Sequence, residues 1–203
     1  MNRLAALTAF GLLIAAQIFA GEIREFDVKT TERLGNELVR VSKRPDRGFT
    51  TPEKKLAKEN AIAAIRDRAY QQVRYDYVVL DDPAGSGLLV YALALPKRKG
   101  DVVVGGHYRI GVSADGRVVK RVDLLSQLIE QPKPDAGNSL AALAIAQVEA
   151  KRPVETWIYT SDYYRLPIYV ATMDGSSWRI ANGKIHKFTK AELEKMDSMA
   201  KKK

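Results

Sequence analysis

The first hydrophobic pattern beyond the N-terminal region has the spacing of an α-helix. Leu34, Leu38 and Val41 stand at positions i, i+4 and i+7, and Thr30 or Thr31 can cap such a helix at its N-terminus. Side chains with this spacing lie on one face of a helix. The segment is therefore expected to bury that face in a core.

A second helix is predicted directly after the proline- and glycine-containing segment 43–50. Thr51 offers a cap, Pro52 suits the first helical position, and Glu53 places an acid in the first turn. The apolar positions that continue the pattern are Leu56, Ile62, Ile65, Ala69 and Val73. We therefore expect the helix to extend to Val73.

After residue 74 the pattern changes from helical to strand-like. β-Branched and aromatic residues form short runs separated by turn residues, which is typical of antiparallel strands. The predicted strands are 75–80, 87–95, 105–113 and 117–122. Asp115-Gly116 marks a hairpin turn before the last of them. Asp123 then caps a predicted short amphipathic helix with the sequence LLSQLIEQ.

The residues beyond the proline-rich segment 132–137 are predicted to follow a similar order. Asn138 or Ser139 caps a helix that carries Leu140, Leu143, Ala144 and Val148 on one side. The strands expected after it are ETWIYTS, LPIYVATM, SWRIA and KIHKF, the last two joined by an Asn182-Gly183 turn. The capping-box residues Thr189 and Glu192 open a final basic helix.

The two halves also share residues at matching places. Tyr91 matches Tyr169, Arg109-Ile110 matches Arg179-Ile180, Gly116 matches Gly183, and Lys120 matches Lys187. We interpret the matched segments as one closing hairpin used twice, with its Arg and Lys facing solvent; similar hairpins of independent origin are the alternative. The predicted fold is α+β, with two tandem similar units, each of two helices packed on a four-stranded antiparallel meander sheet. The expected divisions are residues 21–131, a linker at 132–137, and residues 138–203.

This twice-repeated order of two helices and four strands resembles the layout of β-lactamase-inhibitor-protein-like and PepSY-like proteins. The resemblance lies in the order of the elements and in the strand segments quoted above. The chain contains no cysteine and therefore lacks the disulfides of the inhibitor family. The resemblance implies a concave surface of antiparallel strands that clasps another protein.

The N-terminal residues indicate export. Arg3 precedes an uncharged stretch from Leu4 to Ala20, and a small-residue cleavage site ends before Gly21. We predict a signal peptide at residues 1–20 and a periplasmic or secreted protein; an uncleaved membrane anchor is the alternative. No other long apolar run is present, so no stable membrane insertion is expected after cleavage.

The charge of the chain favours anionic partners. The formal net charge is +9, and loss of Arg3 leaves +8. An exported protein without a dense basic stripe is not expected to bind nucleic acid. A mildly basic surface suits an acidic protein or an anionic component of the cell envelope, or it serves only solubility.

The sequence carries no local signature of catalysis or metal binding. His107 and His186 lack neighbouring ligands at metal-site spacing. The segment PAGSGL joins two predicted strands and lacks the first glycine of a nucleophile elbow, and GGHYRIG lacks the helix and the Lys-Ser/Thr pair of a phosphate loop. We therefore expect a non-enzymatic protein with no catalytic residues, no metal and no cofactor.

Aromatic residues are concentrated in the segment TWIYTSDYYR. In a strand, Trp157 and Tyr159 share one face of the sheet, and Tyr163, Tyr164 and Arg165 extend that face into the adjoining loop. Tyr, Trp and Arg contribute most to binding at protein interfaces. These five residues are the candidate binding site; filling of the core is the alternative reading of the same pattern.

Together these features predict an exported protein that binds another macromolecule through aromatic-rich sheet faces, in an inhibitor, immunity or envelope-accessory role. Two alternatives remain open at this point. A small-ligand carrier requires an enclosed apolar cavity, and a hydrolase requires a convergent cluster of acid, base or nucleophile.

Overall fold

The computed structural model describes residues 23–85, 87–131 and 140–200. The predicted signal peptide, residues 1–20, and the predicted linker, residues 132–137, lie outside the described residues. The helices and strands are α1 (Val28–Ser42), α2 (Pro52–Ile65), β1 (Arg74–Asp81), β2 (Gly87–Leu95), β3 (Val102–Val104), β4 (Tyr108–Ser113), β5 (Val119–Leu124), β6 (Ile129–Gln131), β7 (Leu143–Gln147), α3 (Thr156–Tyr164), β8 (Ile168–Thr172), β9 (Ser177–Ala181), β10 (Lys184–Lys187) and α4 (Lys190–Ala200).

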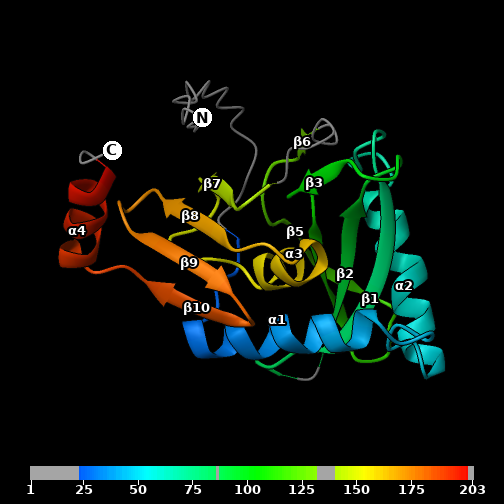
Figure 1. Ribbon diagram of the computed structural model, residues 1–203. Helices are drawn as coiled ribbons and strands as arrows, with labels where there is room; N and C mark the ends of the chain where they lie inside the picture. The colour runs from blue at the N-terminus through cyan, green and yellow to red at the C-terminus, as the bar shows by residue number, and fades with distance from the viewer. Residues whose placement is uncertain (1–22, 86, 132–139, 201–203) are drawn as a thin grey trace.

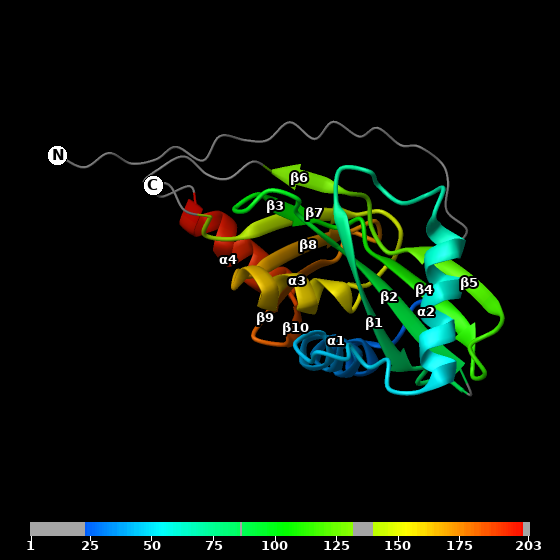
Figure 2. The same ribbon diagram turned by 90° about the vertical axis from the view of Figure 1, so that its right-hand side faces the viewer.

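The elements form successive layers (Figures 1 and 2). The first sheet has the strand order β1-β2-β4-β5 and is antiparallel throughout. Helix α2 covers one face of this sheet, while α1 and α3 lie against the other. The second sheet, β10-β9-β8-β7, packs on the far side of α1 and α3. The predicted α+β class is confirmed.

Strand β2 shows why the first sheet has both faces covered. Its sequence GLLVYALAL is buried over nearly its whole length, and its bounds are those predicted. Leu88, Val90 and Ala92 pack with α2, whereas Leu89, Tyr91 and Leu93 alternate onto the face toward α1 and α3. A continuous apolar run suits a strand with core on both sides.

Local chemistry determines where the first two helices begin. Asp27 rather than Thr30 caps α1, because its Oδ1 accepts a hydrogen bond from the Thr30 N–H at 2.8 Å. Thr51 caps α2, as predicted. Helix α2 ends at Ile65 and not at Val73: the Arg66 N–H donates to the Ala63 carbonyl in a tighter turn, and further along the Arg68 carbonyl accepts a bond from the Tyr108 hydroxyl.

The C-terminal hairpin and helix also follow the prediction. The β9–β10 hairpin turns at Asn182-Gly183, where both residues have positive φ. Thr189 and Glu192 form the predicted capping box: the Glu192 carboxylate accepts from the Thr189 N–H at 2.7 Å, and the Thr189 hydroxyl accepts from the Glu192 N–H at 3.3 Å. Helix α4 follows directly.

Three predicted elements are wrong. The helix predicted over 140–148 is strand β7, in which Leu143, Ile145 and Gln147 are buried in alternation and pair in parallel with β8. The LLSQLIEQ segment is not helical, because its residues 129–131 pair as β6 with the short strand β3. The strand predicted for ETWIYTS is helix α3.

The second half of the chain therefore does not repeat the first. Strand β7 lies parallel to β8, so the second sheet is not an antiparallel meander throughout. One helix stands between these two strands and another ends the chain, whereas both helices precede the first sheet. The predicted similarity of two tandem units is not confirmed. The largest apolar cluster draws residues from both sides of the 132–137 segment.

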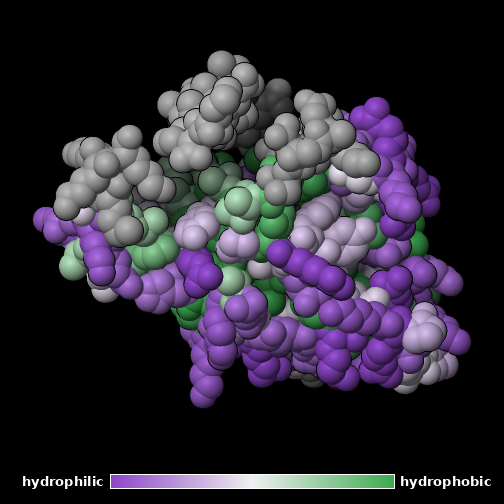
Figure 3. Space-filling model, in the orientation of Figure 1, coloured by the Kyte–Doolittle hydropathy of each residue, from purple (hydrophilic) through white to green (hydrophobic). Residues whose placement is uncertain are grey.

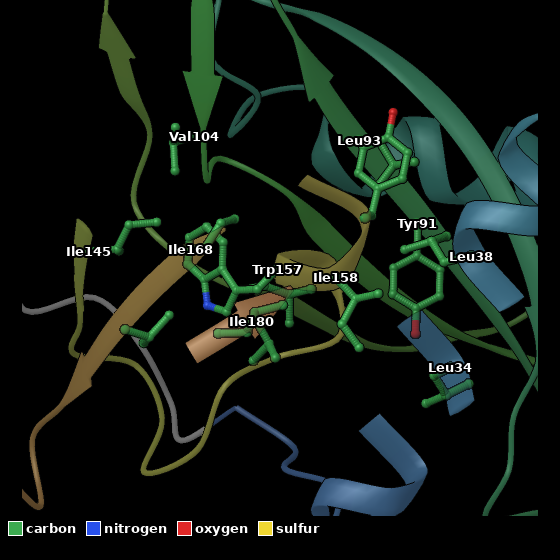
Figure 4. Close-up of a cluster of buried hydrophobic side chains, with 14 of the residues drawn as sticks. Leu34, Leu38, Tyr91, Leu93, Val104, Ile145, Trp157, Ile158, Ile168 and Ile180 are labelled. Atoms are coloured by element: carbon green, nitrogen blue, oxygen red, sulfur yellow. The ribbon is translucent and has the colours of Figure 1, made fainter. Parts of the chain in front are cut away.

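Helix α3 lies at the centre of that cluster (Figure 4). Trp157 is fully buried and packs among Ile145, Ile168 and Ile180 of the second sheet, and the adjacent Ile158 faces α1 and the first sheet. Helix α3 also packs against α1. Gly35 of α1 lets the two helices approach closely. A Cβ at this position would lie 2.7 Å from the Ile158 Cβ.

We expect Gly35→Ala to destabilise the protein by about 1–3 kcal/mol, because the added methyl group forces α1 and α3 apart and this overpacking outweighs the better helix propensity of alanine. The measurement is the free energy of unfolding in urea. Gly85→Ala is the control, since a Cβ there meets no atom within 4 Å. Equal stability of the Gly35 variant and the wild type would show that the helices do not meet at this residue.

Candidate functional site

Three adjoining pockets form a groove over the C-terminal end of α3, which we call the α3 groove. The central pocket, about 560 Å³, lies between α1, β1 and α3 and includes Arg74, Asp162, Tyr163 and Arg165. The second, about 390 Å³, shares Arg74 and Tyr163 and extends along the 96–102 loop. The third, about 470 Å³, shares Asp162 and Arg165 and extends to the β9–β10 hairpin. Because each neighbouring pair shares lining residues, the three pockets lie side by side along this surface.

Side chains on this face of the molecule are mainly polar. Figure 3 shows the face in the orientation of Figure 1, with pale side chains over α3 at the centre and strongly hydrophilic ones bordering them over α1. Eight basic residues line the α3 groove against three acidic ones. The basic residues are Lys43, Arg47, Arg74, Lys97, Arg98, Lys99, Arg165 and Arg179; the acidic ones are Asp76, Asp101 and Asp162.

The acidic residues of the groove are held in ion pairs. Asp162 accepts from Lys43 at 2.8 Å, Asp76 pairs with Arg47 at 3.4 Å, and Asp101 pairs with Arg98 at 2.8 Å. Because acids are outnumbered, the groove carries excess positive charge after this pairing. Arg165 is exposed and forms no ion pair with another described residue.

Three tyrosines form the aromatic part of the groove. The Tyr159 and Tyr163 rings lie 5.9 Å apart, and Tyr163 meets Tyr164 edge to face at 4.9 Å. Tyr163 is 43% exposed. The Tyr164 hydroxyl accepts a hydrogen bond from the Val103 N–H at 2.8 Å, and burial raises the pKa of Tyr164 to about 12. The hydrogen bond and the burial hold Tyr164 in place as a neutral phenol.

The structure separates the five sequence-predicted site residues. Tyr163, Tyr164 and Arg165 lie together in the α3 groove, and Tyr159 contributes a ring edge although it is mostly buried. Trp157 does not belong to an exposed face: its indole N–H donates to Gln147 inside the core. The strand interpretation placed Trp157 beside Tyr159, whereas in a helix the two side chains point about 200° apart.

The basic residues of the groove were not predicted from the sequence. Lys43 and Arg47 follow α1, Arg74 begins β1, and Lys97 to Lys99 lie between β2 and β3. These residues are far apart in the chain, and no local motif connects them. The net charge was the only sequence signal that pointed to them.

No match was found among protein-family models, curated proteins or solved structures. Within the described ranges, no helix is long and apolar enough to cross a membrane. The same residues contain no group of three or more His, Asp or Glu side chains arranged to hold a metal ion.

A buried ion cluster fixes α3 relative to the first sheet. Arg109 on β4 donates to Glu155 at 2.8 Å, just before α3, and to Asp123 on β5 at 2.9 Å. The Arg109 side chain also donates to the Arg24 carbonyl, and the Tyr91 hydroxyl donates to Glu155 at 2.9 Å. Arg109, Asp123 and Glu155 are all at most 5% exposed.

The predicted solvent-facing role of Arg109 is therefore wrong. Burial alone would lower the pKa of Arg109, but Glu155 and Asp123 raise it above its ordinary value, so the guanidinium stays charged. Its sequence counterpart Arg179 is exposed, as expected. Asp123 caps no helix and instead belongs to β5.

His107 supports α3 from the same sheet. The Ala94 N–H donates to its Nδ1 at 2.9 Å, and its Nε2 lies 3.2 Å from the Thr160 hydroxyl, which itself donates to the Thr156 carbonyl. Both contacts suit a neutral ring with its proton on Nε2. Complete burial lowers the pKa of His107 to about 3. His107 is thus inside the core.

Arg109→Met is expected to destabilise the fold by about 3–5 kcal/mol, because it leaves the carboxylates of Glu155 and Asp123 buried without their shared partner. Arg179→Met, the matched exposed position, is expected to change stability by about 0.5 kcal/mol or less. Urea unfolding of both variants measures the difference. Similar losses in the two variants would mean that the cluster does not hold the fold.

His107 makes stability depend on pH. Its pKa is about 3 when folded, against an ordinary value of 6.5, so below pH 6.5 only the unfolded chain takes up the proton. Stability therefore falls by about 1.4 kcal/mol per pH unit between these values from this residue alone. Urea unfolding at pH 6 and pH 4 is expected to show this loss in the wild type and in His186→Asn, but a shallower one in His107→Asn. If stability falls as steeply between pH 6 and pH 4 in His107→Asn as in the wild type, His107 is not the cause of the loss.

Proposed function

We propose that this protein is an exported, non-enzymatic binding protein whose α3 groove holds an acidic segment of another polypeptide. One observation carries the proposal: exposed Tyr163 lies in a row of adjoining pockets in which basic residues outnumber acidic ones by eight to three. Tyrosine and arginine are the residues that contribute most at interfaces. The excess positive charge selects a partner of opposite sign.

The distribution of charge favours a polypeptide over a uniform polyanion. Asp76, Asp101 and Asp162 are spread along the groove, one or more in each pocket. A chain with a negative charge at every unit would place some of its charges beside these three carboxylates and compete with them for Lys43, Arg47 and Arg98. A polypeptide can place acids opposite the arginines and other side chains opposite the aspartates.

The N-terminal sequence supports an exported location, periplasmic or secreted, for this activity. Binding of a partner protein without chemistry fits an inhibitor, an immunity protein or an accessory protein of the cell envelope. Charged side chains line all three pockets of the groove, whereas a small-ligand carrier requires an enclosed apolar cavity.

The test is binding of a fluorescein-labelled copolymer of glutamate and tyrosine, followed by fluorescence anisotropy at increasing salt. Wild type is expected to bind, and added salt is expected to weaken the complex. Tyr163→Ala and Arg165→Asn are each expected to weaken binding about tenfold, since each removes an interface residue of the type that dominates binding. Asparagine is chosen because Arg165 has a φ of 55°, which asparagine tolerates.

Arg117→Asn is the matched control, because Arg117 is exposed in the β4–β5 turn, outside the three pockets. Equal weakening by Arg117→Asn would mean that binding reports net charge and not the groove. Dextran sulfate supplies the second comparison. Tighter binding of dextran sulfate than of the copolymer, lost in Arg165→Asn, would assign the groove to a polyanion and overturn the polypeptide proposal.

A further inference from the structure

A separate cavity of about 370 Å³ opens on the first sheet beside the buried ion cluster. It lies on the face of β2, β4 and β5 that carries Arg109 and Asp123, and it shares no residue with the α3 groove. Its basic residues are Arg24, Arg109, Lys120 and Arg121, and its acidic residues are Asp82 and Asp123. This cavity is independent of the function proposed above.

The absence of a side chain at Gly111 creates part of this space. Gly111 stands in the middle of β4 and pairs with Leu89 and Arg121, which line the same cavity. A Cβ at Gly111 would meet only the Arg121 Cβ, at 3.7 Å, so the backbone does not require glycine for lack of room. Glycine within a strand weakens it. At this position its effect is to leave the sheet face open.

A β-bulge brings two basic side chains to the cavity. Gly111 pairs with Arg121, but the next residue, Val112, pairs with Val119, so Lys120 is the extra residue of β5. Consecutive residues of a regular strand point to opposite faces, whereas a bulge redirects one of them. As a result, Lys120 and Arg121 both line the cavity.

The charges around the cavity are not balanced. Arg24 pairs with Asp82 through two hydrogen bonds of 2.7 and 2.8 Å. Arg109 is balanced by Asp123 and Glu155, and Arg121 also contacts Asp123. Lys120 is exposed and forms no ion pair with another described residue. Lys120 therefore adds to the lining of the cavity a positive charge that no described acid balances.

We propose that this cavity binds a small organic anion, whose carboxylate or phosphate group contacts Lys120 and Arg121 above the space left by Gly111. Both groups are compact oxyanions that accept charge-assisted hydrogen bonds from guanidinium and ammonium. The cavity volume lies at the lower end of the range for small-ligand sites and therefore fits a ligand of few atoms.

The experiment titrates the purified, ¹⁵N-labelled protein with succinate and, separately, with orthophosphate at constant ionic strength. The readout is the amide shift of Gly87 and Gly111, both at the cavity. At least one probe is expected to shift these amides to saturation. Lys120→Gln is expected to weaken binding about tenfold, the effect of losing a hydrogen bond to a charged group. Lys55→Gln, an exposed lysine on α2, is expected to bind as the wild type does.

Gly111→Val fills the space without changing any charge and is expected to abolish saturation, read at Gly87. Lys120→Gln leaves the core untouched, so the test stands even where the valine variant unfolds. Saturation by one probe alone identifies the carboxylate or the phosphate as the group bound. Shifts that rise linearly with both probes, or equal weakening by Lys55→Gln and Lys120→Gln, would overturn the proposal.

Discussion

The structure depends on the position that Arg109 takes between two carboxylates. Its guanidinium joins β4 to β5 through Asp123 and joins the first sheet to α3 through Glu155. Helix α3 needs this connection, because it has no side-chain cap and its residues are mostly β-branched or aromatic, which are poor helix formers. Glu155 also places a negative charge at the positive end of the helix dipole. Tertiary contacts therefore create a helix here that the local sequence does not favour.

A buried charge cluster of this kind contributes more to specificity than to net stability. Desolvation of the three ions offsets much of their attraction, so an apolar core of similar shape would be as stable. A guanidinium with acceptors on β5, before α3 and at Arg24 fits only one arrangement of those segments. Apolar contacts are less directional than these hydrogen bonds, so the cluster constrains the arrangement more narrowly than apolar packing alone does.

The elements that local chemistry specifies were predicted from the sequence, and those that depend on distant partners were not. Strand β2 has no charged residue and is almost entirely apolar, and the Asn182-Gly183 turn admits few alternatives. Leu140, Leu143, Ala144 and Val148 have helical spacing and predict a helix over 140–148. Pairing with β8 makes residues 143–147 a strand instead, in which Leu143, Ile145 and Gln147 alternate into the core. Arg109 and Arg179 share a local sequence, yet only one is buried, since only Arg109 faces a second layer.

The residues of the groove were likewise predicted only where they are adjacent in the sequence. How the fold holds them in place matters for the proposed binding. Tyr163, Tyr164 and Arg165 are adjacent in the chain, so the sequence places them together, whereas Lys43 and Arg74 reach them only through the fold. Their positions are set before any partner arrives. Asp162 is held by Lys43, and Tyr164 is held by the Val103 N–H. Because α3 is fixed at one end by Arg109 and along its length by Trp157 in the core, a partner bound as proposed would meet a helix that is already in position. Binding to such a surface loses little conformational entropy, so a modest number of contacts suffices for a specific complex.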